Sequence, residues 1–254
     1  MIDLHCHILP GIDDGAKTLE DSLDLARAAE ADGIHTIVAT PHHRNGAFDN
    51  DGNAIPQLVE DLNSHIKEHE IDVTVLPGQE NRLTGELVDE LKQGTAIPVH
   101  KSRYVLVEFP SVQVPHYANR LFFDLQVEGY MPIIVHPERN KTFAEHPNKL
   151  YELLQAGALT QVTADSFTKK VPKKTRQCAE LLLDHHMVHV IASDAHDVNR
   201  RTFDLSTAYQ SIQAKRGEEE VFYLMENAER IIDNETIYPE PPQQVKKKKF
   251  LGIF

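Results

Sequence analysis

The first fifteen residues, MIDLHCHILPGIDDG, place two histidines and two aspartates close together. His5 and His7 are two residues apart, so on a strand both imidazoles would point to one side and Cys6 to the other. Asp13 and Asp14 follow on the next loop, one as a candidate ligand and the other as a candidate turn cap. Imidazole and carboxylate groups together suit Mn²⁺, Fe or Zn²⁺, so this segment predicts part of a metal site.

Further histidines and acidic residues follow or end short apolar runs along the rest of the chain. These residues, with one neighbouring arginine, are His42, His43, Glu80, Glu108, His136, Glu138, Arg139, Asp194 and His196. Without a cation, a converging set of imidazoles and carboxylates would be a cluster of costly, competing charges. Two members have alternatives: His43 as a supporting or surface neighbour of His42, and Glu138 as an ion-pair partner of Arg139 or another residue.

Seven apolar runs would position these side chains. Each is short, rich in β-branched residues and bounded by Gly, Pro or polar residues, which is typical of a buried strand. The runs are MIDLH, HTIVAT, VTVLPG, YVLVEF, MPIIVH, LTQVTA and HVIASD. Helical patterns lie between them, at residues 18–33, 55–70 and 173–186 among others. In the first, Thr18 and Asp21 predict an N-cap and a capping box.

Strands alternating with helices predict an α/β fold with a parallel sheet and right-handed crossovers. Closure into a barrel close to the eight-stranded (β/α) type is one arrangement, and an open doubly wound sheet is the alternative. In a barrel, the C-terminal ends of the strands meet at one mouth. Six of the seven runs deliver His, Glu or Asp to that mouth. The sequence therefore predicts a polynuclear metal site there.

Composition limits the class of protein. The chain has 254 residues, which fits one large domain, and its formal net charge of −13 argues against a nucleic-acid binder. Two cysteines give no disulfide framework. The N-terminus lacks a basic region followed by an apolar run, and no stretch approaches the ~20 apolar residues of a membrane span. We therefore expect no signal peptide and a cytoplasmic location.

The last segment, YPEPPQQVKKKKFLGIF, differs in composition from the rest. We expect residues 1–238 to form the domain and residues 239–254 a Pro- and Lys-rich C-terminal tail. Lys246–Lys249, with Phe250 and Phe254, could make a weak contact with an anionic membrane surface or a partner. The alternative is a tail that is disordered or folds back on the domain.

The cysteines do not fit a cysteine phosphatase. Such enzymes use a thiolate with an arginine six residues further on, so that one loop cradles the phosphate. Six residues after Cys6 is Ile12, and six after Cys178 is Asp184. A cysteine mechanism is therefore excluded, and both cysteines are expected to be structural.

The motifs DLHCHILPGIDDG, TPHH, GQE, VEF, VHPERN and SDAH together resemble the PHP phosphoesterase family, named for polymerase and histidinol phosphatase. HCHILPGIDDG with VHPERN is similar more specifically to the bacterial manganese-dependent protein tyrosine phosphatases of capsule and exopolysaccharide operons. These enzymes act on a cognate bacterial protein tyrosine kinase and its phosphorylated substrates. The resemblance covers nearly the whole chain.

The resemblance implies a distorted seven-stranded (β/α) barrel of the PHP type with three divalent metals. Manganese is favoured because no cysteine is among the expected ligands, with Fe or Zn²⁺ as alternatives. The implied ligands are His5, His7, Glu80 and Asp194 for the first metal, Glu80, Glu108 and His136 for the second, and Asp14, His42 and His196 for the third. Arg139 and Arg201 match positions that hold the phosphate.

The expected reaction is attack on phosphorus by a hydroxide formed from a water that two metals share. The third metal and the two arginines would hold the phosphate oxygens. A small-molecule phosphatase, such as one for histidinol phosphate, is the alternative within the enzyme class. A non-catalytic regulatory module is the alternative outside it, but such a module should have lost ligands, and none is missing here.

Overall fold

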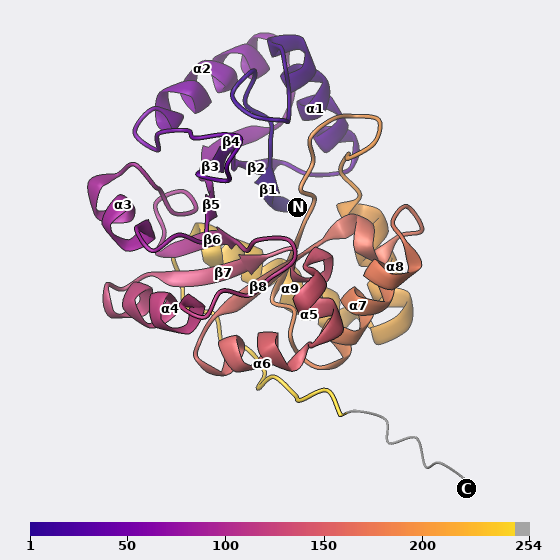
Figure 1. Cartoon of the computed structure of the whole chain (residues 1–254). Coiled ribbons are helices and arrows are strands. Elements are labelled where there is room, and N and C mark those ends of the chain that lie inside the picture. Colours follow the sequence, from indigo (N-terminus) through magenta and orange to yellow (C-terminus); the bar gives the residue numbers. More distant parts are fainter. Residues whose placement is uncertain (247–254) are drawn as a thin grey trace, which may run out of the picture.

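The computed structural model describes residues 1–246, and all seven expected strands are present in it (Figure 1). They are β1 (Ile2–Cys6), β2 (Thr36–Ala39), β4 (Thr74–Pro77), β6 (Tyr104–Glu108), β7 (Met131–Val135), β8 (Leu159–Thr163) and β9 (Val190–Ala192). Two shorter strands, β3 (His42–His43) and β5 (Glu80–Arg82), were not predicted separately.

The strands form two parallel sheets. Their orders are β1-β2-β4 and β3-β5-β6-β7-β8-β9. The division arises because β2 ends at Ala39 and β4 ends at Pro77. After a gap of two residues each path resumes, as β3 at His42 and as β5 at Glu80. The pairing of Ala39 with Pro77 and of His42 with Glu80 has the same offset, so the register continues across the break. A proline lacks the N–H that a ladder needs, which explains the interruption at Pro41.

The first strand also lies beside the last. The Asp194 N–H donates to the His5 carbonyl oxygen over 2.8 Å, and the His7 N–H donates to the Ala195 carbonyl oxygen over 2.8 Å. The predicted parallel α/β architecture is confirmed. The predicted closed seven-stranded barrel is not, because the strands of residues 1–246 pair as two sheets with only the single bridge of Cys6 and Ala195 between β1 and the end of β9.

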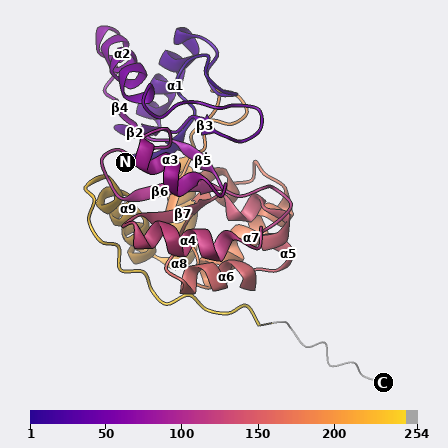
Figure 2. The same cartoon turned by 60° about the vertical axis from the view of Figure 1, so that its left-hand side comes forward.

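Helices cover the outside of both sheets (Figures 1 and 2). They are α1 (Leu19–Ala31), α2 (Ile55–Glu68), α3 (Leu87–Gln93), α4 (Ala118–Val127), α5 (Lys141–Glu145), α6 (Asn148–Gln155), α7 (Lys173–Asp184), α8 (Leu205–Arg216) and α9 (Glu218–Ile232), with the 3₁₀ turns η1 (Pro137–Arg139) and η2 (Ala164–Phe167). The predicted capping box of Thr18 and Asp21 is present at the start of α1. The helices predicted near residues 55–70 and 173–186 are α2 and α7.

Alternation along the strands divides the core into two layers. Val105 and Val107 of β6 belong to the large cluster that packs against the helices. Leu106, between them, points to the other face of the strand and belongs to an inner cluster, to which other strands contribute residues from the same face. Helix α9 adds Ala228 and Ile231 to this inner cluster and contacts β1 and β9. The two-residue period of a strand therefore supplies both layers.

The described part of the C-terminal segment, residues 239–246, runs along the domain without helix or strand. The Gln243 N–H donates to the His185 carbonyl oxygen, and Val245 exchanges two hydrogen bonds with the Asn148 side chain. Lys247–Phe254, which include most of the residues expected to contact a membrane or partner, lie outside the described residues. No helix within residues 1–246 is long and apolar enough to cross a membrane.

Candidate metal centre

The structure brings the nine predicted metal ligands to one edge of the sheets. His5, His42, Glu80 and Glu108 lie on strands, and the others lie on the loops that follow strands: His7, Asp14, His136, Asp194 and His196. Ring centroids of His7 lie 5.3 Å from His5, 4.6 Å from His42 and 3.8 Å from His196. Strands that run parallel deliver their C-terminal ends to the same edge, which is why residues distant in sequence meet.

One group consists of His5, His7 and Glu80. His5 Nε2 lies 3.3 Å from His7 Nε2, and Glu80 Oε2 lies 3.4 Å from each of these nitrogens. Three donor atoms this close together could all contact one cation at ordinary metal–ligand distances. Asp194 Oδ1 faces the same two nitrogens at 3.5 and 3.4 Å. This is the predicted first ligand set.

A second group surrounds Asp14. Its Oδ1 lies 3.3 Å from His42 Nε2 and 3.4 Å from His196 Nε2. His7 completes a group of four residues whose donor atoms could share one cation. The predicted third ligand set is therefore brought together, with His7 as an addition that the sequence did not indicate.

The third arrangement differs in detail from the prediction. Glu80 Oε1 lies 2.7 Å from His136 Nε2, and Glu80 Oε2 lies 2.8 Å from His42 Nδ1. Donor atoms of Glu80 and Glu108 group with His42 rather than with His136. Glu108 is also paired with Arg82 over 2.9 Å, a contact that was not predicted. Glu80 thus touches histidines of every group, as a bridging carboxylate would.

The donor set fits divalent cations. His42 Nδ1, His196 Nε2 and Glu80 Oε2 are buried, and although His42 Nδ1 faces Glu80 Oε2 and His196 Nε2 faces Asp14, none of the three atoms makes a hydrogen bond of suitable geometry among the described residues. Burial opposes a charge on His42, but the Asp14 and Glu80 carboxylates outweigh it and raise its pKa to about 9. Burial likewise opposes ionisation of Glu80, but the imidazoles of His5 and its neighbours hold the pKa of Glu80 well below its usual range. Carboxylates so arranged demand positive charge, which protons or metal ions can supply.

Two ligands have unusual backbones. His136 has a φ of 36° and Asp194 a φ of 56°, both in the left-handed region that residues other than glycine rarely adopt. Each follows the end of a strand, β7 or β9. Such a conformation costs of order 1–3 kcal/mol and is typical of functional sites, where the surrounding structure holds it.

The two predicted phosphate-binding arginines meet at Asp194. Arg139 Nη1 and Arg201 Nη2 both donate to Asp194 Oδ2, over 2.7 and 2.6 Å. Arg139 also donates to both oxygens of Asp165 through Nη2. A cavity of about 180 Å³ lies beside them, lined by both arginines and by Glu80, Glu108 and His136. Cationic donors and candidate ligands therefore border the same small space, as phosphate binding requires.

Comparison with known proteins identifies the family. The family model for capsular polysaccharide synthesis proteins of the CpsB/CapC type matches residues 1–233. The chain belongs to the CpsB/CapC family. It is 42% identical over 254 residues to the tyrosine-protein phosphatase YwqE of Bacillus subtilis, covering all of both chains. It is 29% identical over 248 residues to the tyrosine-protein phosphatase CpsB of Streptococcus agalactiae, covering 93% of this chain and 100% of that one.

Solved structures agree with this assignment to the CpsB/CapC family. A crystal structure reported for YwqE from Bacillus subtilis and CpsB from Streptococcus pneumoniae, described as metal-dependent tyrosine phosphatases, matches with a TM-score of 0.95 at 42% identity, over 97% of this chain and all of that one. The organophosphorus hydrolase of Deinococcus radiodurans, at 13% identity and a TM-score of 0.55 over 91% of each chain, shares the fold alone. The chain is thus an enzyme of a phosphatase family, as predicted, and the small-molecule alternative is not favoured.

Two residues of this CpsB/CapC chain, Asp13 and Gln161, contact candidate ligands from behind, and a third, Asp165, holds Arg139. Asp13 accepts from His7 Nδ1 over 2.8 Å and from the backbone N–H groups of Gly15 and His42. Gln161 Oε1 lies 3.0 Å from His5 Nδ1. From the sequence the role of Asp13 was open, and Gln161 and Asp165 were not predicted. A long polar side chain at the centre of a short predicted strand, Gln161 in LTQVT, was the signal that could have identified it.

Asp13→Asn is expected to weaken metal binding at least about tenfold, because partners that fix the tautomer and orientation of a ligating histidine typically contribute 10–100-fold. An amide can still accept a hydrogen bond, but it lacks the charge that favours His7 as a ligand. The measurement is phosphate release against Mn²⁺ concentration. Asp61→Asn, an exposed change on α2, is the matched control. An unchanged Mn²⁺ midpoint would contradict this role.

The remaining predicted candidates lie outside the cluster. His43 is buried and faces Asp49 and Glu90, at 3.2 and 3.8 Å. Glu138 accepts from the Thr163 N–H and from the hydroxyls of Thr163 and Ser166, so it anchors the loop after β8 and is not the ion-pair partner considered for Arg139.

The cysteines have the properties expected of structural residues. Cys6 and Cys178 are both buried free thiols. Burial raises the pKa of Cys178 to about 12 and that of Cys6 well above its usual value. Neither supplies a thiolate at neutral pH, which agrees with the exclusion of a cysteine mechanism.

Proposed function

We propose that this chain hydrolyses phosphotyrosine in proteins with three divalent cations held by His5, His7, Asp14, His42, Glu80, Glu108, His136, Asp194 and His196. The observation that carries the proposal is the convergence of these side chains with Arg139 and Arg201 at one cavity. Manganese is the favoured metal because the ligands are imidazoles and carboxylates without a thiolate, and Fe or Zn²⁺ are the alternatives.

The cations would supply Lewis-acid activation of a water nucleophile and charge neutralisation at the phosphate oxygens. Side chains of the protein would bind and orient the phosphate. Within residues 1–246, the Arg201 side chain donates one hydrogen bond, from Nη2 to Asp194. Its other N–H groups are therefore able to donate to a phosphate oxygen. Arg139 is held on one side by Asp194 and on the other by Asp165, which fixes the direction of its guanidinium. A tyrosine phenolate, with a pKa of about 10, leaves without full protonation, so no strong general acid is required.

We propose that the two sheets together form the wall of a distorted seven-stranded barrel of the PHP type. The continuous register from β2-β4 into β3-β5 and the hydrogen bonds that join β1 to the end of β9 support this arrangement. We also propose residues 1–238 as the phosphatase domain and residues 239–254 as its tail. Ile237 is part of the inner core whereas the side chain of Tyr238 is 77% exposed, which supports the boundary.

The proposed protein substrates are a bacterial tyrosine kinase and the proteins that it phosphorylates. The support is family membership: the matching family is one of capsular polysaccharide synthesis, and its named relatives are tyrosine-protein phosphatases. The net charge of −13 supports the absence of a nucleic-acid partner. A contact of the Lys-rich tail with a membrane or a partner remains a prediction from the sequence.

The test is phosphate release, with Mn²⁺, from a phosphotyrosine peptide and from histidinol phosphate at equal concentration. The peptide is expected to be hydrolysed at least about tenfold faster, since a phenolate leaves more readily than an alkoxide. His136→Ala provides the inactive control, and His116→Ala, at an exposed histidine outside the site, provides the matched active one. Faster hydrolysis of histidinol phosphate would overturn the proposed substrate class.

A further inference from the structure

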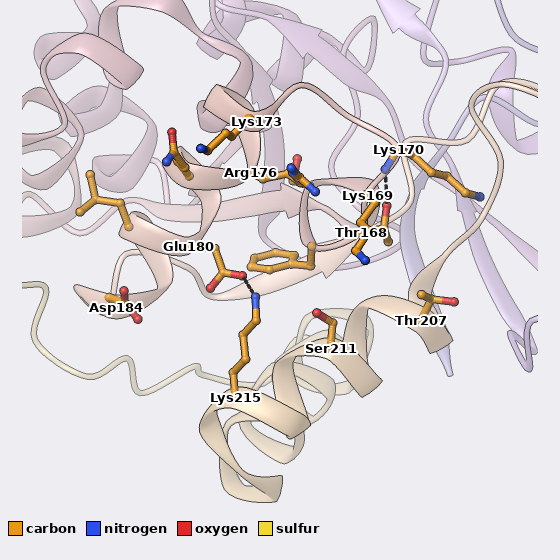
Figure 3. Close-up of a pocket in the computed structure, with 14 residues that line it drawn as sticks. Thr168, Lys169, Lys170, Lys173, Arg176, Glu180, Asp184, Thr207, Ser211 and Lys215 are labelled. Atoms are coloured by element: carbon orange, nitrogen blue, oxygen red, sulfur yellow. Dashed lines mark hydrogen bonds and ion pairs between the residues drawn. The ribbon is translucent and has the colours of Figure 1, made fainter.

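A second hollow, the basic groove, lies between α7, α8 and the segment that includes the end of η2 and the residues after it. Its volume is about 890 Å³. Lys169 after η2, Arg176 on α7 and Lys215 on α8 approach it from three separate segments (Figure 3). Phe167 and Leu181 add apolar surface to the lining. The groove therefore combines cations with an apolar wall.

The charge of the groove is opposite to that of the whole protein. Residues 166–179 contain five lysines and arginines and no acidic residue, in a chain with a net charge of −13. Within the groove, Lys170 is paired with Asp204 and Lys215 with Glu180. Among residues 1–246, Lys169, Lys173 and Arg176 have no ion-pair or side-chain hydrogen-bond partner. Arg176 is only partly exposed, so its unpaired guanidinium faces a site that an anion would complete.

The turn η2 connects the groove to the catalytic site. Asp165 of η2 receives two hydrogen bonds from Arg139, which borders the phosphate-sized cavity. Phe167 of the same turn lines the groove. Asp165 and Phe167 both belong to η2, which is only four residues long, so we expect an extended peptide whose phosphotyrosine lies at Arg139 to reach the groove within a few residues.

We propose that the basic groove docks an acidic segment of the same phosphoprotein, a few residues from its phosphotyrosine. This inference rests on the proposed function. Lys169, Lys173 and Arg176 would contact Asp or Glu side chains, and Phe167 with Leu181 would accept an apolar side chain between them. Glu180 and Asp184 also line the groove, and they disfavour a long, uniformly charged polyanion such as a nucleic acid.

The test compares two phosphotyrosine peptides. In the acidic peptide Asp and Glu flank the phosphotyrosine, and in the neutral peptide Asn and Gln replace them. The variant is K169Q/K173Q/R176Q, and the control variant K67Q/R120Q/K149Q removes three exposed cations from α2, α4 and α6. The groove variant is expected to raise KM for the acidic peptide about tenfold at unchanged kcat, because these contacts serve binding rather than chemistry. Its KM for the neutral peptide and its activity on p-nitrophenyl phosphate should stay at wild-type values.

Binding of the unphosphorylated peptides, measured by fluorescence anisotropy, separates this inference from the proposed function. Wild-type protein should bind the acidic peptide more tightly than the neutral one, and added salt should weaken that preference. If neither phosphotyrosine peptide is hydrolysed but the acidic peptide still binds more tightly than the neutral one, the proposed function is refuted and the docking role is not. Equal binding of both peptides, an unchanged preference in the groove variant, or equal competition by an oligonucleotide of the same charge would overturn the docking role.

Discussion

Glu80→Gln is expected to lower phosphotyrosine hydrolysis at least about 10³-fold at saturating Mn²⁺, to the level of chelated wild-type protein. Glu80 is buried, and its two oxygens face four histidines: His5, His7, His42 and His136. An amide lacks the negative charge that would hold cations together at this point, and its N–H₂ group would face the imidazoles. A loss of about 4 kcal/mol of transition-state stabilisation corresponds to the expected factor.

The control for this experiment is Glu86→Gln, the same chemical change at an exposed residue six positions further along the chain. Phosphate release is measured across a Mn²⁺ titration, with circular dichroism to establish that each variant is folded. Chelation followed by Mn²⁺ should inactivate and then restore the wild-type enzyme. If Glu80→Gln retains activity within tenfold of wild type at saturating Mn²⁺, the bridging role of Glu80 is wrong.

Gly15→Ala is expected to lower activity about 100-fold and the free energy of unfolding by about 1–3 kcal/mol. A Cβ at this position would lie 2.0 Å from the His7 carbonyl oxygen and 2.5 Å from His7 Cβ. The loop must then move away from His7, and Asp14 moves with it. Overpacking of a rigid region costs about this much stability, and a displacement of about 1 Å at a catalytic site can cost 10²-fold in rate.

Gly85→Ala is the matched control, because a Cβ there meets no atom within 4 Å. Activity against Mn²⁺ concentration and thermal unfolding are measured for both variants. A Gly15→Ala enzyme with wild-type activity and Mn²⁺ midpoint would show that the loop can adjust without moving its ligands. Such a result would remove the structural reason for a glycine between Asp14 and Ala16.

The positions of the strands and of the ligands at their ends could be predicted from local patterns. The run YVLVEF is short and apolar with its acidic residue last, and it forms β6 with Glu108 at its end. The spacing of His5, on β1, and His7, just after it, predicts that both rings lie on one side of the chain, and both contact Glu80. Short-range periodicity suffices here because a buried strand must be apolar along its length and its polar residues must lie at the open edge.

Contacts across the sheets could not be predicted in the same way. The pairing of Glu108 with Arg82 depends on the register between β5 and β6. Strand β5 is short and begins only after the break at Gly78 and Gln79, so local patterns do not show this register. The contact of Gln161 with His5 joins residues 156 positions apart. Neither residue type is distinctive in its own segment, so only the assembled sheets show which side chains meet.

The sequence by itself determined that this chain alternates strands with helices, that its strands end in histidines and carboxylates suited to binding metal, and that it resembles metal-dependent tyrosine phosphatases. Tertiary structure alone decided that the strands pair as two sheets, that Asp13 contacts His7, and that lysines without an ion-pair partner among residues 1–246 line a groove at η2. The physical reason is the distance along the chain over which each kind of interaction acts. Periodicity and turn chemistry act over a few residues, whereas register, ligand support and a groove between two helices arise from contacts between segments far apart in the chain.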